Sequence, residues 1–102
     1  MVAEPVVESI DDLEVETRNQ FFADMLRVGR AIRKVTGADK VNYLLLGNKD
    51  PALHVHIVPR YADEADEFRA HGPWKYSEYV KFDIERDAAL IRQLKQEIDC
   101  ND

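Results

Sequence analysis

Residues 41–61 read VNYLLLGNKDPALHVHIVPRY, and this stretch decides the fold of the chain. It holds two apolar runs, Val41–Leu46 and Leu53–Val58, separated by a segment rich in glycine, asparagine, aspartate and proline. Such runs are typical of β-strands, and the residues between them are typical of a turn. Because the connection is short, we expect an antiparallel hairpin whose second strand ends before Pro59.

Two histidines stand two residues apart in the second run. Side chains alternate between the two faces of a strand, so His54 and His56 should point to one face and the apolar residues between and beside them to the other. Ala52 would share the histidine face if the strand extends that far. Two adjacent imidazoles pack poorly in a core, but they suit a site that handles protons or phosphate.

Two other interpretations of His54 and His56 stay open. Histidines on a strand are often structural or simply solvated. A metal site is the second alternative, but it needs at least one more ligand nearby. His71 lies in a separate polar segment, and the carboxylates show no ligand spacing. We therefore expect no metal and no other cofactor.

A long helix precedes the hairpin. Apolar residues recur at spacings of three and four between Phe21 and Val35, which predicts a helix from about Val15 to Thr36. Gly37 is well placed as its C-terminal stop. Gly29 weakens the middle of a helix, so its presence indicates a close neighbour packing on that side.

The remaining segments are shorter or more polar. Pro5–Ile10 is predicted to be a short edge strand. The segment Tyr61–Tyr79, with an acidic cluster at residues 63–67, is predicted to be an extended, solvated loop. A closing helix is expected from about Ile84 to Ile98, with Asp83 as its N-cap. Residues 1–4 and 99–102 are expected to be loose termini.

The composition indicates one small domain of the α+β class, with a small antiparallel sheet, one long helix and a C-terminal helix. A chain of 102 residues that is 45% hydrophobic can bury a single core. Its net charge of −6 argues against a nucleic acid polymer as partner, because such binding relies on basic surfaces. One cysteine, no apolar run near the ~20 residues that span a membrane, and no basic leader favour the cytoplasm, away from membranes.

The segment from Gly47 to Tyr61 resembles the signature region of the histidine triad (HIT-like) family. A branch of that family with a short preceding loop carries Gly-Asn-x-x-Pro-His-Leu-His-x-His-Ile-x-Pro-Arg-Tyr. The chain matches this pattern nearly residue for residue, except that Ala52 stands in place of the first histidine. The resemblance covers roughly residues 5–98. The early strands of the family have no counterpart here, so the resemblance implies either a HIT-like domain shortened at its N-terminus or a chain start downstream of the usual one.

The resemblance also implies roles for individual residues. His54 matches the middle histidine, which attacks the α-phosphorus of a nucleotide and forms a nucleotidyl-histidine intermediate. His56 matches the third histidine, which lies beside the same phosphate and assists charge and leaving-group handling. Asn48 matches a polar residue near the phosphate. The substrates implied are dinucleoside polyphosphates or nucleotide phosphoramidates.

The expected substrate-binding set is completed by the residues around the two histidines, namely Asn48, Lys49, Ala52 and Arg60. Lys49 and Arg60 are the nearest cations in sequence, and the alternative for both is a solvated surface charge. The peptide N–H groups of the turn at residues 48–53 are further candidate donors to a phosphate.

Three functions follow from these residues. The preferred one is a nucleotide hydrolase or nucleotidyl transferase that binds a nucleotide or a nucleotide conjugate. Because Ala52 removes one triad member, a catalytically weakened or inactive nucleotide-binding protein is the first alternative, and a dimeric interaction module is the second. Family members commonly form two-fold dimers, so a homodimer is expected, with Leu44–Leu46 as apolar contact surface or as ordinary core.

Overall fold

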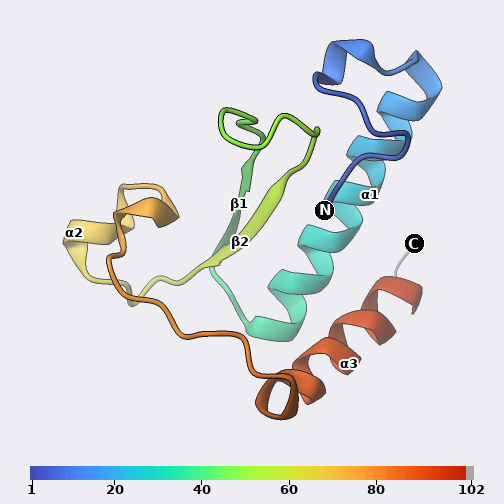
Figure 1. The fold of residues 1–102 in the computed structure, drawn as a ribbon. Helices are drawn as coiled ribbons and strands as arrows, with labels where there is room; N and C mark the ends of the chain where they lie inside the picture. Colours follow the sequence, from blue (N-terminus) through green and yellow to red (C-terminus); the bar gives the residue numbers. More distant parts are fainter. Residues whose placement is uncertain (101–102) are drawn as a thin grey trace.

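The computed structural model describes residues 1–100 of the chain. Figure 1 shows two paired strands with a long helix along one side of them and a second long helix packed beside the C-terminal half of the first. The elements in chain order are η1 (Ile10–Asp12), α1 (Val15–Thr36), β1 (Lys40–Leu44), β2 (His56–Arg60), α2 (Asp66–Arg69), η2 (Pro73–Lys75) and α3 (Ile84–Cys100). The predicted α+β architecture is confirmed. Within the described residues, no helix combines the length and the apolar character that crossing a bilayer requires.

The bounds of α1 are those that the apolar spacing predicted. The helix ends where Gly37 adopts a left-handed φ of 72° and donates its N–H to the Arg33 carbonyl over 3.0 Å. A residue with a Cβ resists this conformation, so glycine makes the stop sharp. Phe21 faces the core and is 6% exposed. The helix therefore forms the support against which the strands and α3 pack.

Gly29 brings β1 close to the middle of α1. A Cβ built at this position would lie 2.0 Å from the hydroxyl oxygen of Tyr43 and 2.7 Å from its Cζ. No side chain fits in that space without displacing the tyrosine. The predicted close neighbour of Gly29 is thus confirmed, and it is Tyr43 on β1.

The two strands pair in antiparallel fashion, with Lys40 opposite Arg60 and Leu44 opposite His56. The hairpin was predicted correctly, but the strand ends were not. The first strand stops at Leu44, and the second begins at His56 and runs through Pro59 to Arg60. Proline lacks an N–H to donate, and it is tolerated here because each strand of a two-stranded sheet has a free edge.

The segment just before β2 pairs with the start of the chain instead of with β1. The Ala3 N–H donates to the Leu53 carbonyl over 3.0 Å, and the Val55 N–H donates to the Met1 carbonyl over 2.8 Å. Ala3 is only 2% exposed. The expectation that residues 1–4 form a loose terminus is therefore wrong for the first three of them, because their backbone supplies partners that this segment would otherwise lack.

The predicted edge strand at Pro5–Ile10 is also wrong. The chain turns there into η1, and Ser9 caps this short helix by accepting a hydrogen bond from the Asp11 N–H over 3.3 Å. The Ser9 N–H in turn donates to the Asp12 carboxylate over 3.2 Å. Such local hydrogen bonds between side chains and backbone compete with strand pairing.

The core lies between the first half of α1, the start of the chain and the segment before β2. Its buried members are Ala3, Leu13, Phe21, Leu53 and Val55. Leu53 and Val55, at 3% and 1% exposure, come from the histidine-bearing segment itself. Their burial fixes which face of that segment points outward.

The segment Tyr61–Tyr79 is mostly irregular, as predicted, but it contains α2 and η2, which the sequence analysis missed. The prediction that its acidic cluster is solvated is wrong for Glu64, whose side chain is only 9% exposed. A run of acidic residues gave no indication of this burial, because the partner of Glu64 lies on β2.

The closing helix begins at its predicted cap. The Asp83 Oδ1 accepts hydrogen bonds from the N–H groups of Glu85 and Arg86, both over 3.0 Å. The helix continues through Cys100, slightly past the predicted end at Ile98. Of the tail that was expected to be loose, residues 101–102 lie outside the described part of the chain.

Candidate active site

His54 and His56 lie on the same face, as the alternation of a strand predicted. Their ring centroids are 4.9 Å apart, and the ring planes meet at 88°, edge to face. His54 is half-buried and His56 is exposed. Leu53 and Val55 anchor the opposite face in the core, so a register slip by one residue would bury both imidazoles.

The tautomer of His54 follows from its hydrogen bond to the backbone. Its Nδ1 lies 2.6 Å from the Ala52 carbonyl oxygen. A carbonyl oxygen can only accept a hydrogen bond, so Nδ1 carries the proton and donates it. In the neutral ring the lone pair then resides on Nε2, the ring nitrogen on the side away from this backbone contact. In this form His54 presents Nε2 as the ring nitrogen with an available lone pair.

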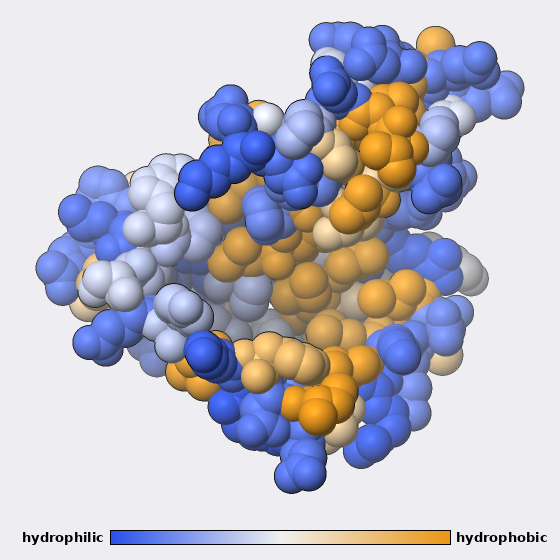
Figure 2. Space-filling view, in the orientation of Figure 1, coloured by the Kyte–Doolittle hydropathy of each residue, from blue (hydrophilic) through white to orange (hydrophobic). Residues whose placement is uncertain are grey.

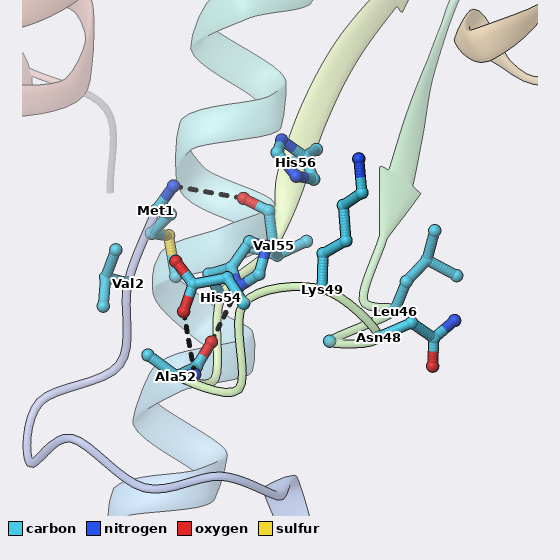
Figure 3. A pocket seen from close by; sticks show the side chains of 11 residues that line it. Met1, Val2, Leu46, Asn48, Lys49, Ala52, His54, Val55 and His56 are labelled. Carbon is cyan, nitrogen blue, oxygen red and sulfur yellow. Dashed lines mark hydrogen bonds between the residues drawn. The ribbon is translucent and has the colours of Figure 1, made fainter.

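A cavity of about 630 Å³ opens in front of the two histidines. Its lining includes Asn48, Lys49 and Ala52 from the turn together with both imidazoles. Figure 3 shows the Lys49 side chain extending toward the side of His56, whereas the Asn48 amide points away from the histidines. A cavity of this size suits a small ligand such as a nucleotide.

Two of the peptide N–H groups that were predicted to bind phosphate already have partners. The Ala52 N–H donates to the Asp50 carboxylate over 3.1 Å. The Leu53 N–H donates to the Val7 carbonyl over 2.7 Å. For these two groups the prediction is wrong, because the fold uses them to hold the turn.

Residues of the cavity that the sequence analysis missed include Asp50, Met1 and Val2. Asp50 was interpreted only as turn chemistry, since aspartate is common in turns. Val2 forms an isolated bridge with His54. Nothing in so short a stretch at the start of the sequence signalled that it lies beside the histidines.

The structure does not bring Arg60 to this cavity. Its guanidinium uses every N–H group inside the protein: Nε and Nη2 donate to the Glu64 carboxylate over 3.1 and 3.0 Å, and Nη1 donates to the Asn42 Oδ1 over 2.7 Å. The remaining N–H groups donate to the carbonyls of His71 and Phe68 over 2.7 and 2.9 Å. Arg60, which was predicted to bind substrate, thus has no N–H group free for a ligand in the histidine cavity and does not line that cavity. The alternative of a solvated charge is wrong, because the side chain is only 7% exposed.

Glu64 is the counter-ion at the centre of this second cluster. The hydrogen bonds from Arg60, followed by those from the Tyr76 hydroxyl and the Tyr61 N–H, lower the pKa of Glu64 from 4.5 to about 2. The carboxylate is therefore charged at neutral pH. Tyr76 also stacks on Phe68 with ring centroids 4.2 Å apart. The ion pair between Arg60 and Glu64 thus holds the segment after β2 against the C-terminal end of that strand.

The charged side chains that line the histidine cavity are one cation, Lys49, and one anion, Asp50, besides the imidazoles. In the part of the chain that the structure describes, no group of three or more His, Cys, Asp or Glu side chains is arranged to hold a metal ion. What the cavity offers chemically is an unprotonated imidazole nitrogen, a second imidazole beside it and a flexible cation at the rim.

Comparison with solved structures relates most of the chain to histidine triad proteins. A histidine triad protein from Bradyrhizobium japonicum superposes with a TM-score of 0.80 and 32% identity, over 93% of this chain and 69% of that one. Similar proteins from Sinorhizobium meliloti 1021 and Marinobacter aquaeolei VT8 share the fold, both with TM-scores of 0.79, at 21% and 22% identity. These two matches cover 89% and 94% of this chain, and 66% and 69% of the two proteins, respectively. No protein-family model matches the chain. No curated protein matches it closely either.

Proposed function

This chain belongs to the histidine triad family, and we propose that it cleaves or transfers a nucleotide at its α-phosphorus with His54 as the nucleophile. We assign it to the branch with the short loop, with Ala52 in place of the first triad histidine. The observation that carries the proposal is the 2.6 Å contact between His54 Nδ1 and the Ala52 carbonyl, which leaves Nε2 with its lone pair. His54 lines a cavity large enough for the ligand.

In the proposed reaction, Nε2 of His54 forms a bond to the α-phosphorus while the bond from phosphorus to the leaving group breaks. His56 in its protonated form gives the leaving group a proton and balances charge on the phosphoryl oxygens. Water then attacks the nucleotidyl-histidine and gives a proton to His56, which is neutral after the first step; the phosphorus–Nε2 bond breaks, and a nucleoside monophosphate leaves. The ring of His56, 4.9 Å from that of His54, lies within reach of the same phosphoryl group.

Local charge supports a nucleotide phosphoramidate over a dinucleoside polyphosphate. A polyphosphate brings several negative charges, and Asp50 on the cavity wall offsets the one lysine there. Arg60, which was expected to add a second cation, is fully engaged by Glu64 and by its other partners. A single phosphoryl group with an amine as leaving group places the least negative charge in the cavity.

The test is turnover of a fluorogenic adenosine phosphoramidate, with diadenosine polyphosphates assayed in parallel. We expect His54→Ala to abolish turnover and His56→Ala to reduce it by about a hundredfold. His71→Ala is the matched control, because His71 is an exposed histidine outside the histidine cavity. Equal turnover in wild type and His54→Ala would rule out His54 as the nucleophile.

Intact-mass measurement adds a direct assay of the covalent step. Rapid acid-free quenching of wild type and His56→Ala should trap a nucleotidyl adduct, and peptide mapping should place it on His54. The adduct should be missing from His54→Ala.

The alternative of a nucleotide-binding protein with little or no activity is supported by Ala52, whose methyl group can neither donate nor accept a proton. Micromolar binding of AMP in calorimetry, together with no turnover of any substrate, would favour this alternative. Absence of both turnover and nucleotide binding would contradict both functions.

We also propose that two copies of the chain associate. The end of the segment between η2 and α3 and the first residue of α3 carry exposed apolar side chains: Val80 is 78%, Phe82 69% and Ile84 63% exposed. Figure 2 shows this apolar surface beside a hollow that is itself partly apolar. The predicted contact surface lies elsewhere, near Leu46, which is 59% exposed. Side chains of this size rarely stay open to water together, and a second copy covering them is consistent with the expected homodimer.

A further inference from the structure

The peptide group to which His54 donates is held from its other side. The Ala52 carbonyl and the Leu53 N–H belong to one peptide group, and in a trans peptide they point in opposite directions. The N–H donates to the Val7 carbonyl over 2.7 Å, and the carbonyl accepts from His54 Nδ1 over 2.6 Å. The carbonyl of Val7 therefore helps to aim the acceptor that sets the His54 tautomer.

The preceding peptide group is held by a side chain. The Oδ1 of Asp50 accepts the Ala52 N–H over 3.1 Å, the contact drawn as the dashed line that ends on the Ala52 nitrogen in Figure 3. An aspartate that accepts from the N–H two residues on fixes a tight turn. The neighbours contribute nothing comparable, because Pro51 has no N–H and the Ala52 side chain is a methyl group.

We infer that Asp50 is a positioning residue for His54. It holds the backbone at Ala52, whose carbonyl then keeps the imidazole proton on Nδ1 and the lone pair on Nε2. The inference rests on the proposed function for its consequence in turnover, but the tautomer can be observed without any substrate.

Loss of the contact between Asp50 and the Ala52 N–H should change the tautomer population of His54 and leave the fold intact. When Asp50 is truncated, the Ala52 N–H loses its acceptor, and only the hydrogen bond from the Leu53 N–H to the Val7 carbonyl still holds the backbone here. The Ala52 carbonyl can then rotate away from the His54 ring. His54 would then populate both neutral tautomers, as a solvated histidine does. Molecules with the proton on Nε2 cannot attack phosphorus, and a freely rotating ring is aimed less often.

The experiment is long-range ¹H–¹⁵N NMR of the histidine rings in labelled protein at a pH where they are neutral. The signals of the three histidines are assigned with the variants His56→Asn and His71→Asn. We expect pure Nδ1–H shifts for His54 in wild type and in Asp50→Asn, whose amide oxygen can still accept the Ala52 N–H. We expect averaged shifts in Asp50→Ala. A merely structural role would not move these shifts.

Phosphoramidate turnover gives the second readout. The kcat of Asp50→Ala should fall by about three- to tenfold, the effect of one lost hydrogen bond, while KM changes by less than about twofold and Asp50→Asn restores kcat. If Asp50→Ala does not fold, Asp50→Glu replaces it, since the longer side chain keeps the charge but displaces the acceptor.

The outcomes separate the two proposals. A pure Nδ1–H tautomer in both Asp50→Ala and Asp50→Glu would overturn the role of Asp50. If only one of these two variants folds and it keeps the pure Nδ1–H tautomer, the role of Asp50 is overturned as well. Averaged shifts in the variants without turnover in any protein would support the positioning role and contradict the proposed function.

Discussion

Arg60 and Glu64 form an ion pair in which both side chains are almost fully removed from water, at 7% and 9% exposure, with Nη2 and Oε1 3.0 Å apart. The pair lies at the C-terminal end of β2, away from His56 at its N-terminal end. Two peptide carbonyls and Asn42 complete the coordination of the guanidinium. The family-like Pro-Arg sequence after the histidines therefore has a structural role in this chain.

Removing one partner of this pair should destabilise the protein. Glu64→Ala leaves a buried guanidinium without its counter-ion, which typically costs about 3 kcal/mol in the free energy of unfolding. Glu67→Ala is the matched control, because Glu67 is an exposed acid of the same cluster and its loss should cost less than about 0.5 kcal/mol. Urea denaturation followed by circular dichroism measures both values. Equal effects of the two substitutions would contradict a buried, stabilising pair.

The pair also predicts how stability depends on pH. The pKa of Glu64 is lowered from 4.5 to about 2 in the folded protein, chiefly by its hydrogen bonds with Arg60. A carboxyl group with a lowered pKa stabilises the fold fully above its unfolded pKa, and the contribution is lost as pH falls toward the folded pKa. The free energy of unfolding should thus decline between about pH 4.5 and 2. In Glu64→Gln this decline should be shallower, and an unchanged slope would argue against the shift.

Gly29 and Tyr43 allow a test of the contact between α1 and β1. In the wild-type background, Gly29→Ala forces the tyrosine ring to move, and we expect a loss of about 1–2 kcal/mol. In a Tyr43→Ala background the same substitution should stabilise by up to about 1 kcal/mol, because alanine favours a helix more than glycine does. Thermal or urea unfolding of the four proteins gives the coupling energy. The same sign in both backgrounds would contradict the close approach seen here.

Adding a third imidazole at position 52 should raise the proposed activity. Position 52 lines the cavity beside both histidines, so Ala52→His places an additional proton donor at the same phosphoryl group. We expect phosphoramidate turnover to rise by at least about tenfold. Ala52→Gln is the control for side-chain size, and it should leave turnover unchanged or lower. If both variants lose activity equally, the cavity does not accept a larger side chain at this position.

Association of two copies should depend on the apolar segment before α3. Phe82→Ser is expected to shift the protein toward the monomer in sedimentation velocity, with an affinity loss of about tenfold or more. Val15→Ser serves as control, since Val15 is an exposed apolar residue too, at 59%, but lies at the start of α1. If the wild-type protein stays monomeric at high concentration, the proposed association is contradicted. If the protein is a dimer whose affinity does not change in Phe82→Ser, the interface lies elsewhere.

Features that depend on near neighbours in the chain could be predicted from the sequence alone. The bounds of α1, the glycine stop at Gly37 and the Asp83 cap of α3 all follow from contacts within one helical turn. The common face of His54 and His56 follows from strand alternation, which every strand obeys. The signature around these histidines likewise led to the family, because residue types and spacing are local information.

Other features depend on partners that are far apart in sequence, and only the tertiary structure decided them. The start of the chain pairs with the segment before β2 across more than fifty residues, as in the 3.1 Å contact between the Met1 nitrogen and the Val55 carbonyl at a separation of 54. Arg60 was predicted to bind substrate because the sequence could not reveal that Asn42 and Glu64 occupy its N–H groups. Asp50 resembled any turn aspartate until the Ala52 peptide was seen between it and His54. Residue type and spacing specify which groups can form hydrogen bonds, but the free energy of the whole fold selects which of them meet.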